Sequence, residues 1–209
     1  MRKIIIFIFL VLTFICSCSE KKETALDWIN KSDLLWNGGQ YTEPQKAVEY
    51  LNNAIKLQPD FKAAYNNRGN AYNDLGQPQR AIQDYDTAIR LKPDYADAYY
   101  NRGNAYYKLK QYQRAIQDYD TAIRLKPEDS ASYNNRGLAY DSLKQYQRAI
   151  QDFDTAIHLK PDYARAYNNR GISYILSGNN QEACRSFIKA CKLGYCKTYE
   201  TSKQEGDCR

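Results

Sequence analysis

The sequence predicts an all-α protein in which about five helix-turn-helix repeats stack into an alpha-alpha superhelix. Proline recurs every 34 residues, at Pro59, Pro93, Pro127 and Pro161, and glycine recurs with the same step, at Gly69, Gly103, Gly137 and Gly171. The segment AIQDYDTAIRLKP begins at Ala81 and again at Ala115, and its near-copy AIQDFDTAIHLKP begins at Ala149. Self-similarity with a fixed period of this length is typical of stacked repeat architectures.

Composition excludes several other classes of protein. The 209 residues are 43% hydrophobic and include 10 Gly and 6 Pro, so the chain is neither collagen-like nor wholly disordered. The net charge is +6, but the basic residues are dispersed, so we expect no nucleic-acid partner. The single histidine, His158, leaves little from which to build a metal site or a catalytic triad. We therefore expect no cofactor, no metal and no small-molecule substrate.

The N-terminus has the pattern of an export signal. Arg2 and Lys3 precede an apolar run, Ile4 to Ile15, that is too short to span a bilayer as a helix. The segment Ile15-Cys16-Ser17-Cys18 resembles the bacterial lipobox, in which the last cysteine is acylated.

This resemblance implies a signal peptide over residues 1–17, a lipidated Cys18 and a tether over residues 18–24. Acyl chains would anchor the protein in a membrane of the bacterial cell envelope. Because Ser19 and not Asp follows the lipidated cysteine, the resemblance favours the outer membrane. An uncleaved anchor and an unlipidated secreted protein are the alternatives.

Within one repeat, apolar periodicity predicts two helices joined by a tight turn. The first is expected from about Ala63 to Leu75 and the second from about Gln79 to Leu91, with a break at Gly76-Gln77-Pro78. Lys92-Pro93 ends the second helix, because proline cannot continue it. Small residues allow the two helices to approach closely, and they are Gly69, Ala81 and Ala88.

These positions resemble the motif of the tetratricopeptide repeat, which one repeat supplies as Tyr65, Gly69, Tyr72, Ala81, Tyr85, Ala88 and Pro93. The resemblance implies repeats over residues 62–95, 96–129, 130–163 and 164–197. A degenerate repeat over residues 25–61, with three extra residues near Thr42, comes before them, and a Cys-containing cap over residues 198–209 follows. It also implies a right-handed superhelix whose concave face, lined by the first helices, binds a protein or peptide.

The resemblance places ten side chains in a peptide-binding groove: Asn67, Asn70, Tyr100, Asn101, Asn104, Tyr107, Asn134, Asn135, Asn168 and Asn169. Four of them, Asn67, Asn101, Asn135 and Asn169, resemble the asparagine ladder with which such superhelices hold extended peptides. An amide offers both a donor and an acceptor to a peptide backbone. Duplication of whole repeats would leave the same row without any function, so both interpretations stay open.

Two further patterns bear on the groove. The lysine of the family's carboxylate clamp is replaced by Asn66, Tyr100, Asn134 and Asn168, so we do not expect that clamp. Leu138, Ile172 and Ile175 make the C-terminal end more apolar. This suits either an aliphatic or helical anchor of a partner or, as we slightly favour, a cover supplied by the C-terminal tail.

An arginine stands in each repeat where the family usually has leucine: Arg68, Arg102, Arg136 and Arg170. A charge on a partly buried stripe needs a partner. The candidates are Asp84/Asp86, Asp118/Asp120 and Asp152/Asp154. Pairing within a repeat leaves Arg170 unmatched, whereas pairing with the preceding repeat leaves Arg68 facing Tyr50 and Asn52. We expect a structural ladder, not a catalytic site.

Four cysteines are disulfide candidates, Cys184, Cys191, Cys196 and Cys208, because exported proteins form disulfides. Cys184 and Cys191 replace core-facing isoleucines, and about 10.5 Å of helix separates them, which is too far for a direct bridge. We expect each to pair with Cys196 or Cys208 and to hold the tail over the open end of the stack in place of a capping helix. Buried free thiols and a zinc site are the alternatives.

The sequence favours a non-enzymatic interaction scaffold of the bacterial cell envelope. It carries no Gly-rich phosphate loop, nucleophile–base pair or carboxylate dyad that forms a distinguishable catalytic site. The alternatives are a self-assembling structural envelope protein and, less favoured, an adaptor that presents substrates to a cell-wall hydrolase or protease.

Overall fold

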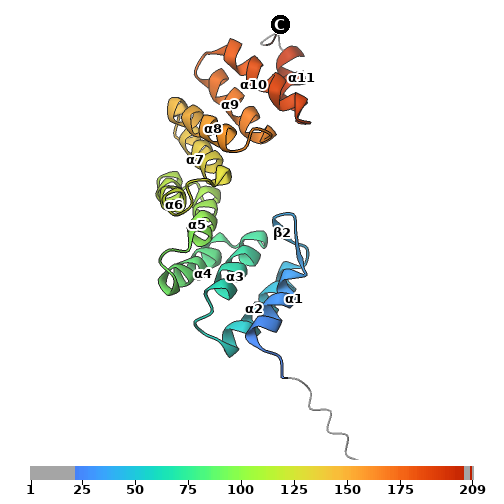
Figure 1. Ribbon diagram of the computed structural model, residues 1–209, viewed down its shortest axis with the longest axis vertical. Helices are drawn as coiled ribbons and strands as arrows, with labels where there is room; N and C mark the ends of the chain where they lie inside the picture. Colours follow the sequence, from blue (N-terminus) through green and yellow to red (C-terminus); the bar gives the residue numbers. More distant parts are fainter. Residues whose placement is uncertain (1–21, 205–207, 209) are drawn as a thin grey trace, which may run out of the picture.

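The computed structural model describes residues 22–204 and residue 208, and within them the chain forms a bowed stack of helix pairs (Figure 1). This confirms the predicted all-α solenoid. The pairs are α1 (Ala25–Asp33) with α2 (Pro44–Leu57), α3 (Lys62–Asp74) with α4 (Pro78–Leu91), α5 (Ala96–Lys108) with α6 (Tyr112–Leu125), α7 (Ser130–Ser142) with α8 (Tyr146–Leu159), and α9 (Ala164–Leu176) with α10 (Asn180–Lys192). A short helix, α11 (Lys197–Gln204), follows. In Figure 1 the N-terminal pair and α11 lie on the same side of the bow.

The turn inside each repeat depends on one residue in the left-handed backbone region. Gly76 and Gly178 take this conformation with φ of 69° and 83°, and Lys110 and Lys144 take it with φ of 59°. The next amide then closes the turn, as where Gln77 N–H donates to the Tyr72 carbonyl over 2.8 Å. Glycine adopts this conformation without strain and lysine does not.

The contact between the two helices of a repeat is a glycine against an aromatic ring. A Cβ added at Gly103 would lie 2.7 Å from the ring of Tyr119, which is closer than atoms can pack. The four rings at this position, Tyr85, Tyr119, Phe153 and Phe187, are at most 1% exposed. The small residues therefore fix the spacing of the helices, and the rings fill the core beside them.

The N-terminal repeat differs from the others by a small β-hairpin between its helices. The strands β1 (Trp36–Asn37) and β2 (Gln40–Tyr41) pair antiparallel, with Trp36 opposite Tyr41. The backbone N–H of Tyr41 donates to Asp74 Oδ2 over 2.8 Å and so attaches the hairpin to the end of α3. The extra length of this repeat is predicted by the sequence, but the hairpin is not.

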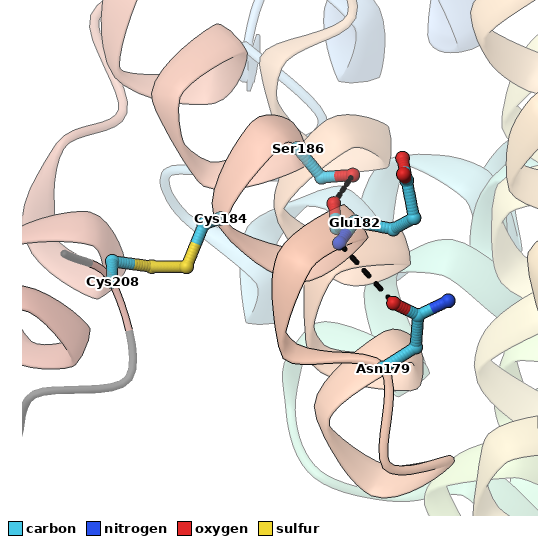
Figure 2. Close-up of a disulfide and its surroundings, with 5 residues drawn as sticks. All are labelled: Asn179, Glu182, Cys184, Ser186 and Cys208. Atoms are coloured by element: carbon cyan, nitrogen blue, oxygen red, sulfur yellow. Dashed lines mark hydrogen bonds between the residues drawn. A yellow bond between two sulfur atoms is a disulfide. The ribbon is translucent and has the colours of Figure 1, made fainter.

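Two disulfides hold the C-terminal end of the described chain. Cys184 of α10 pairs with Cys208, and Cys191 pairs with Cys196 just before α11 (Figure 2). Cys208 is buried in a cluster with Ala183 and Phe187. The expectation that the tail replaces a capping helix is wrong, because Lys197–Gln204 is itself helical. The disulfides and the helix act together at this end.

No helix among residues 22–204 is both long and apolar enough to cross a bilayer. The predicted signal peptide over residues 1–17, Cys18 and the first part of the tether lie outside the described residues.

Candidate functional site

The candidate site is a hollow on the face formed by the first helices of successive repeats. Its volume is about 280 Å³. Asn73 of α3, Asn104, Tyr107 and Lys108 of α5, Tyr119 of α6, and Asn135 and Leu138 of α7 line it. The hollow thus brings together three of the predicted groove residues, Asn104, Tyr107 and Asn135.

The hollow contains polar groups that the fold does not fully use. Asn73 Oδ1 is buried and has no hydrogen-bond partner among the described residues. Beside it, Lys108 Nζ donates to the backbone carbonyl of Asn73 over 3.3 Å, and this lysine is exposed. An acceptor, an ammonium group and the apolar side chain of Leu138 therefore lie in one depression, and a bound chain can engage all three.

The predicted asparagine ladder connects repeats to one another. Asn101 Nδ2 donates to Asn66 Oδ1 over 3.0 Å, and Asn169 Nδ2 donates to Asn134 Oδ1 over the same distance. At the ends of the row the pattern changes. Asn67 donates to Asp33 Oδ1 over 3.2 Å.

Asn135 Nδ2 donates both to Tyr100 OH over 3.0 Å and to Asn104 Oδ1 over 2.9 Å. In the last repeat, Asn168 Oδ1 is buried and has no partner among the described residues. The ladder therefore has a structural role in joining consecutive repeats, which neither of the two sequence interpretations included.

Asn70 and Asn104 hold buried tyrosine hydroxyls. Tyr85 OH donates to Asn70 Oδ1 and Tyr119 OH donates to Asn104 Oδ1, each over 2.8 Å. In the next two repeats the tyrosine becomes phenylalanine and the asparagine becomes an apolar residue, giving Phe153 with Leu138 and Phe187 with Ile172. The apolar end of the groove thus follows from the loss of a hydroxyl in the core. The sequence holds this paired change, but the groove assignment overlooked it.

The apolar C-terminal end is partly covered by the tail. Ile175 is partly buried and packs on the cluster that contains Phe187 and Cys208, together with Tyr199 of α11. Ile172 and Leu176 are 38% and 51% exposed. Cover by the tail, one of the two expectations, therefore applies to Ile175 and not to its two exposed neighbours.

The arginines form a continuous ladder behind the groove. Arg102 donates from Nε and Nη2 to the two oxygens of Asp118, over 2.8 and 2.6 Å, and from Nη1 to Asp86 of the preceding repeat over 2.6 Å. Arg136 repeats this arrangement with Asp152 and Asp120. The two pairings that the sequence left as alternatives therefore occur together.

Neither terminal arginine is unmatched, so that expectation is wrong. Arg68 pairs with Asp84 and donates to Asn52 Oδ1 over 2.7 Å. Arg170 pairs with Asp154 and donates to Ser186 Oγ over 3.1 Å. Asn52 and Ser186 act as neutral acceptors at the two ends of the ladder.

The acidic side of the ladder is strongly desolvated. Asp84, Asp118 and Asp152 are each 5% exposed. Burial raises the pKa of Asp118 and of Asp152, and the hydrogen bonds from Arg102 and Arg136 oppose that rise. This position stabilises the stack and faces its interior. Among the described residues, no group of three or more His, Cys, Asp or Glu side chains is placed to bind a metal.

Comparisons with known proteins agree with this geometry. Family models described as tetratricopeptide repeats match residues 50–83, 96–129, 130–163 and 164–193, and one described as a TPR repeat matches residues 69–110. Among curated protein sequences none matches the chain.

Solved structures with the same fold include two proteins named MamA. A crystal structure of MamA is 28% identical with a TM-score of 0.69, covering 88% of this chain and 95% of the other. MamA 41-end from Desulfovibrio magneticus RS-1 is 26% identical with a TM-score of 0.72, covering 81% and 94%. YrrB, titled a TPR protein with an unusual peptide-binding site, is 23% identical with a TM-score of 0.69, covering 90% and 95%, which shows a shared fold.

Proposed function

Because this chain belongs to the tetratricopeptide repeat family, and so is a protein–protein interaction scaffold, we propose that it binds one segment of a partner protein in the groove at the junction of α3, α5 and α7. We further propose that it has no chemistry of its own and that lipid on Cys18 anchors it in the bacterial outer membrane. The observation that carries the binding site is the hollow of about 280 Å³ with its unpartnered acceptor, Asn73 Oδ1.

The chemistry of the hollow favours an extended or helical segment with an apolar anchor. Tyr107 and Leu138 offer apolar surface, and Lys108 offers a cation at the edge. A buried acceptor without a partner favours a donor from the ligand, because leaving it unpaired costs about 1–3 kcal/mol. A backbone N–H of the bound segment supplies that donor irrespective of its sequence.

The binding site is tested by comparing proteins captured from envelope extract by three versions of the full chain. Lys108→Glu reverses the charge beside the hollow. Arg124→Glu makes the same change of charge on an exposed position of the second helix α6 and serves as the matched control. A protein captured by the wild type and by Arg124→Glu but lost with Lys108→Glu supports the groove. Equal capture by all three versions refutes it.

The membrane anchor is tested separately by mass spectrometry of the mature N-terminus. We expect the chain to begin at Cys18 and to carry acyl groups. A mature chain that begins elsewhere, or an unmodified Cys18, refutes the anchor and leaves the groove untouched.

A further inference from the structure

One loop between repeats lacks the aromatic residue that the others carry. After the proline that ends a second helix, three repeats have Phe61, Tyr95 and Tyr163, whereas the repeat that begins with α7 has Asp129. The backbone is the same, because Ala98 N–H bonds to the carbonyl of Tyr95 as Ser132 N–H bonds to that of Asp129. The repeat has therefore lost a ring and kept the loop.

The ring is packed where it is present. Phe61, Tyr95 and Tyr163 are half-buried, and burial raises the pKa of Tyr95 and Tyr163. Asp129 is too short to occupy the same space. It turns instead to α7, where it accepts from the N–H groups of Ala131 and Ser132 over 3.3 and 3.2 Å and caps the helix.

A hollow of about 380 Å³ lies at this junction. Its apolar lining is the side chains of Ala96, Ala122 and Ala131 and the ring of Tyr100. Ala96 and Ala122 are only 5% and 2% exposed, so this lining belongs to the core of the stack. Asn135 donates to Tyr100 OH over 3.0 Å and holds the ring in place. Because Tyr100 is one of the predicted groove residues, the hollow adjoins the groove.

The polar lining of the hollow is acidic. Three carboxylates, those of Asp97, Glu128 and Asp129, share it with one ammonium group, that of Lys126. Lys126 Nζ bonds to Asp97 Oδ1 over 2.6 Å, and all three carboxylates raise the pKa of Lys126. Three negative charges against one positive charge leave the hollow with a net charge of about −2. Such a site attracts a second cation.

We propose that this hollow binds the side chain of an arginine in the partner segment. The aliphatic stem of an arginine fits against the alanine methyl groups, and its planar guanidinium stacks on the ring of Tyr100 while it pairs with Asp129. Lysine shares the charge but has no planar group to stack. The proposal deepens the proposed function and rests on it, because the arginine belongs to the segment bound in the groove.

The test uses the full chain in detergent with its alanine methyl groups labelled for NMR. The probe is N-acetyl-arginine amide, and N-acetyl-citrulline amide, which has nearly the same shape and no charge, is its control. We expect saturable shifts of the methyl signals of Ala96, Ala122 and Ala131 with the arginine probe, and at least fivefold weaker binding of the citrulline probe. Equal binding of the two probes overturns the proposal, and so does the absence of a saturable shift.

Two variants locate the binding. Asp129→Tyr restores the residue found at Tyr95 and Tyr163, so it is compatible with the fold, and it should abolish the shifts by filling the hollow. Asp129→Asn should keep the cap and weaken arginine binding severalfold. Asp94→Asn makes the same change of charge at the preceding loop and should change nothing. Undiminished binding to Asp129→Tyr would place the arginine elsewhere and overturn the proposal.

The outcome is independent of the partner-capture experiment. The probe binds without any partner, so its failure leaves the groove and its test with Lys108→Glu standing. If the arginine probe binds as expected while Lys108→Glu captures the same proteins as the wild type, the groove assignment fails and the arginine site remains.

Discussion

Replacing Arg136 with alanine isolates the energy held in the arginine ladder. The variant leaves Asp152, which is 5% exposed, without the guanidinium that bonds to both of its oxygens. Removing one member of a buried ion pair typically costs about 3–5 kcal/mol, because the remaining charge stays desolvated. Arg136 keeps some access to water, so we expect the lower end, about 3 kcal/mol.

The chain supplies a matched control in Arg170→Ala. Arg170 occupies the same position, but its partner within the repeat is the neutral Ser186, and its other partner, Asp154, has a side chain that is 50% exposed. An exposed pair contributes about 0–1 kcal/mol and a neutral hydrogen bond about 1 kcal/mol. We expect Arg170→Ala to cost about 1 kcal/mol, so the two variants should differ by about 2 kcal/mol.

The assay is urea-induced unfolding of the full chain at pH 7, followed by far-UV circular dichroism. The double variant Arg136→Ala/Asp152→Ser removes the stranded carboxylate and should recover about 2 kcal/mol. The deficit of the single variant should also shrink towards pH 4. Burial raises the pKa of Asp152, so its penalty is present above that pKa and disappears as the carboxyl takes up a proton. Equal losses in the two single variants, or no recovery in the double variant, would refute the reasoning.

Three further measurements test other parts of the fold. Asn104→Leu should lose about 1–3 kcal/mol of unfolding free energy by stranding the hydroxyl of Tyr119, and adding Tyr119→Phe should restore most of it, so additive losses would contradict the pairing. Burial raises the pKa of Asp141 to about 6, so stability should fall as pH rises from about 4 to 6; Asp141→Asn should raise the melting temperature at pH 8 but not at pH 3.5, and equal effects at both would disprove the cause. Lys144→Gly should stabilise the chain by up to about 1 kcal/mol, because lysine is strained at a φ of 59°, and a loss on denaturation would show that the strain is absent.

Sequence reasoning succeeds where a residue acts through the repeat period. The helix pairs, the glycine contacts and the aromatic core all recur every 34 residues, so one repeat predicts the others. It fails where two repeats meet, because a linear motif does not show that Arg102 reaches Asp118 and Asp86 at once. It also fails at the ends, where the hairpin and α11 have no counterpart in the repeat.

The candidate groove was harder to predict for a related reason. Asn104 and Asn135 were assigned to a ligand, but both amides also bond within the stack. A motif carried over from a family gives the face on which a side chain lies and not how many of its hydrogen bonds the fold already uses. That count needs the neighbouring repeat, which only the structure supplies.

The residues left for recognition are those that break the repeat. Repeated side chains meet repeated neighbours and satisfy one another, as the asparagine and arginine ladders do. Tyr107, Lys108, Asp129 and Leu138 each differ from their equivalents in every other repeat, and all four line one of the two hollows around the junction of α5 and α7. A uniform array offers a partner no preferred register, whereas an irregular junction does. Specificity therefore belongs at this junction, and exchanging these four residues for those of a neighbouring repeat should remove partner binding without unfolding the stack.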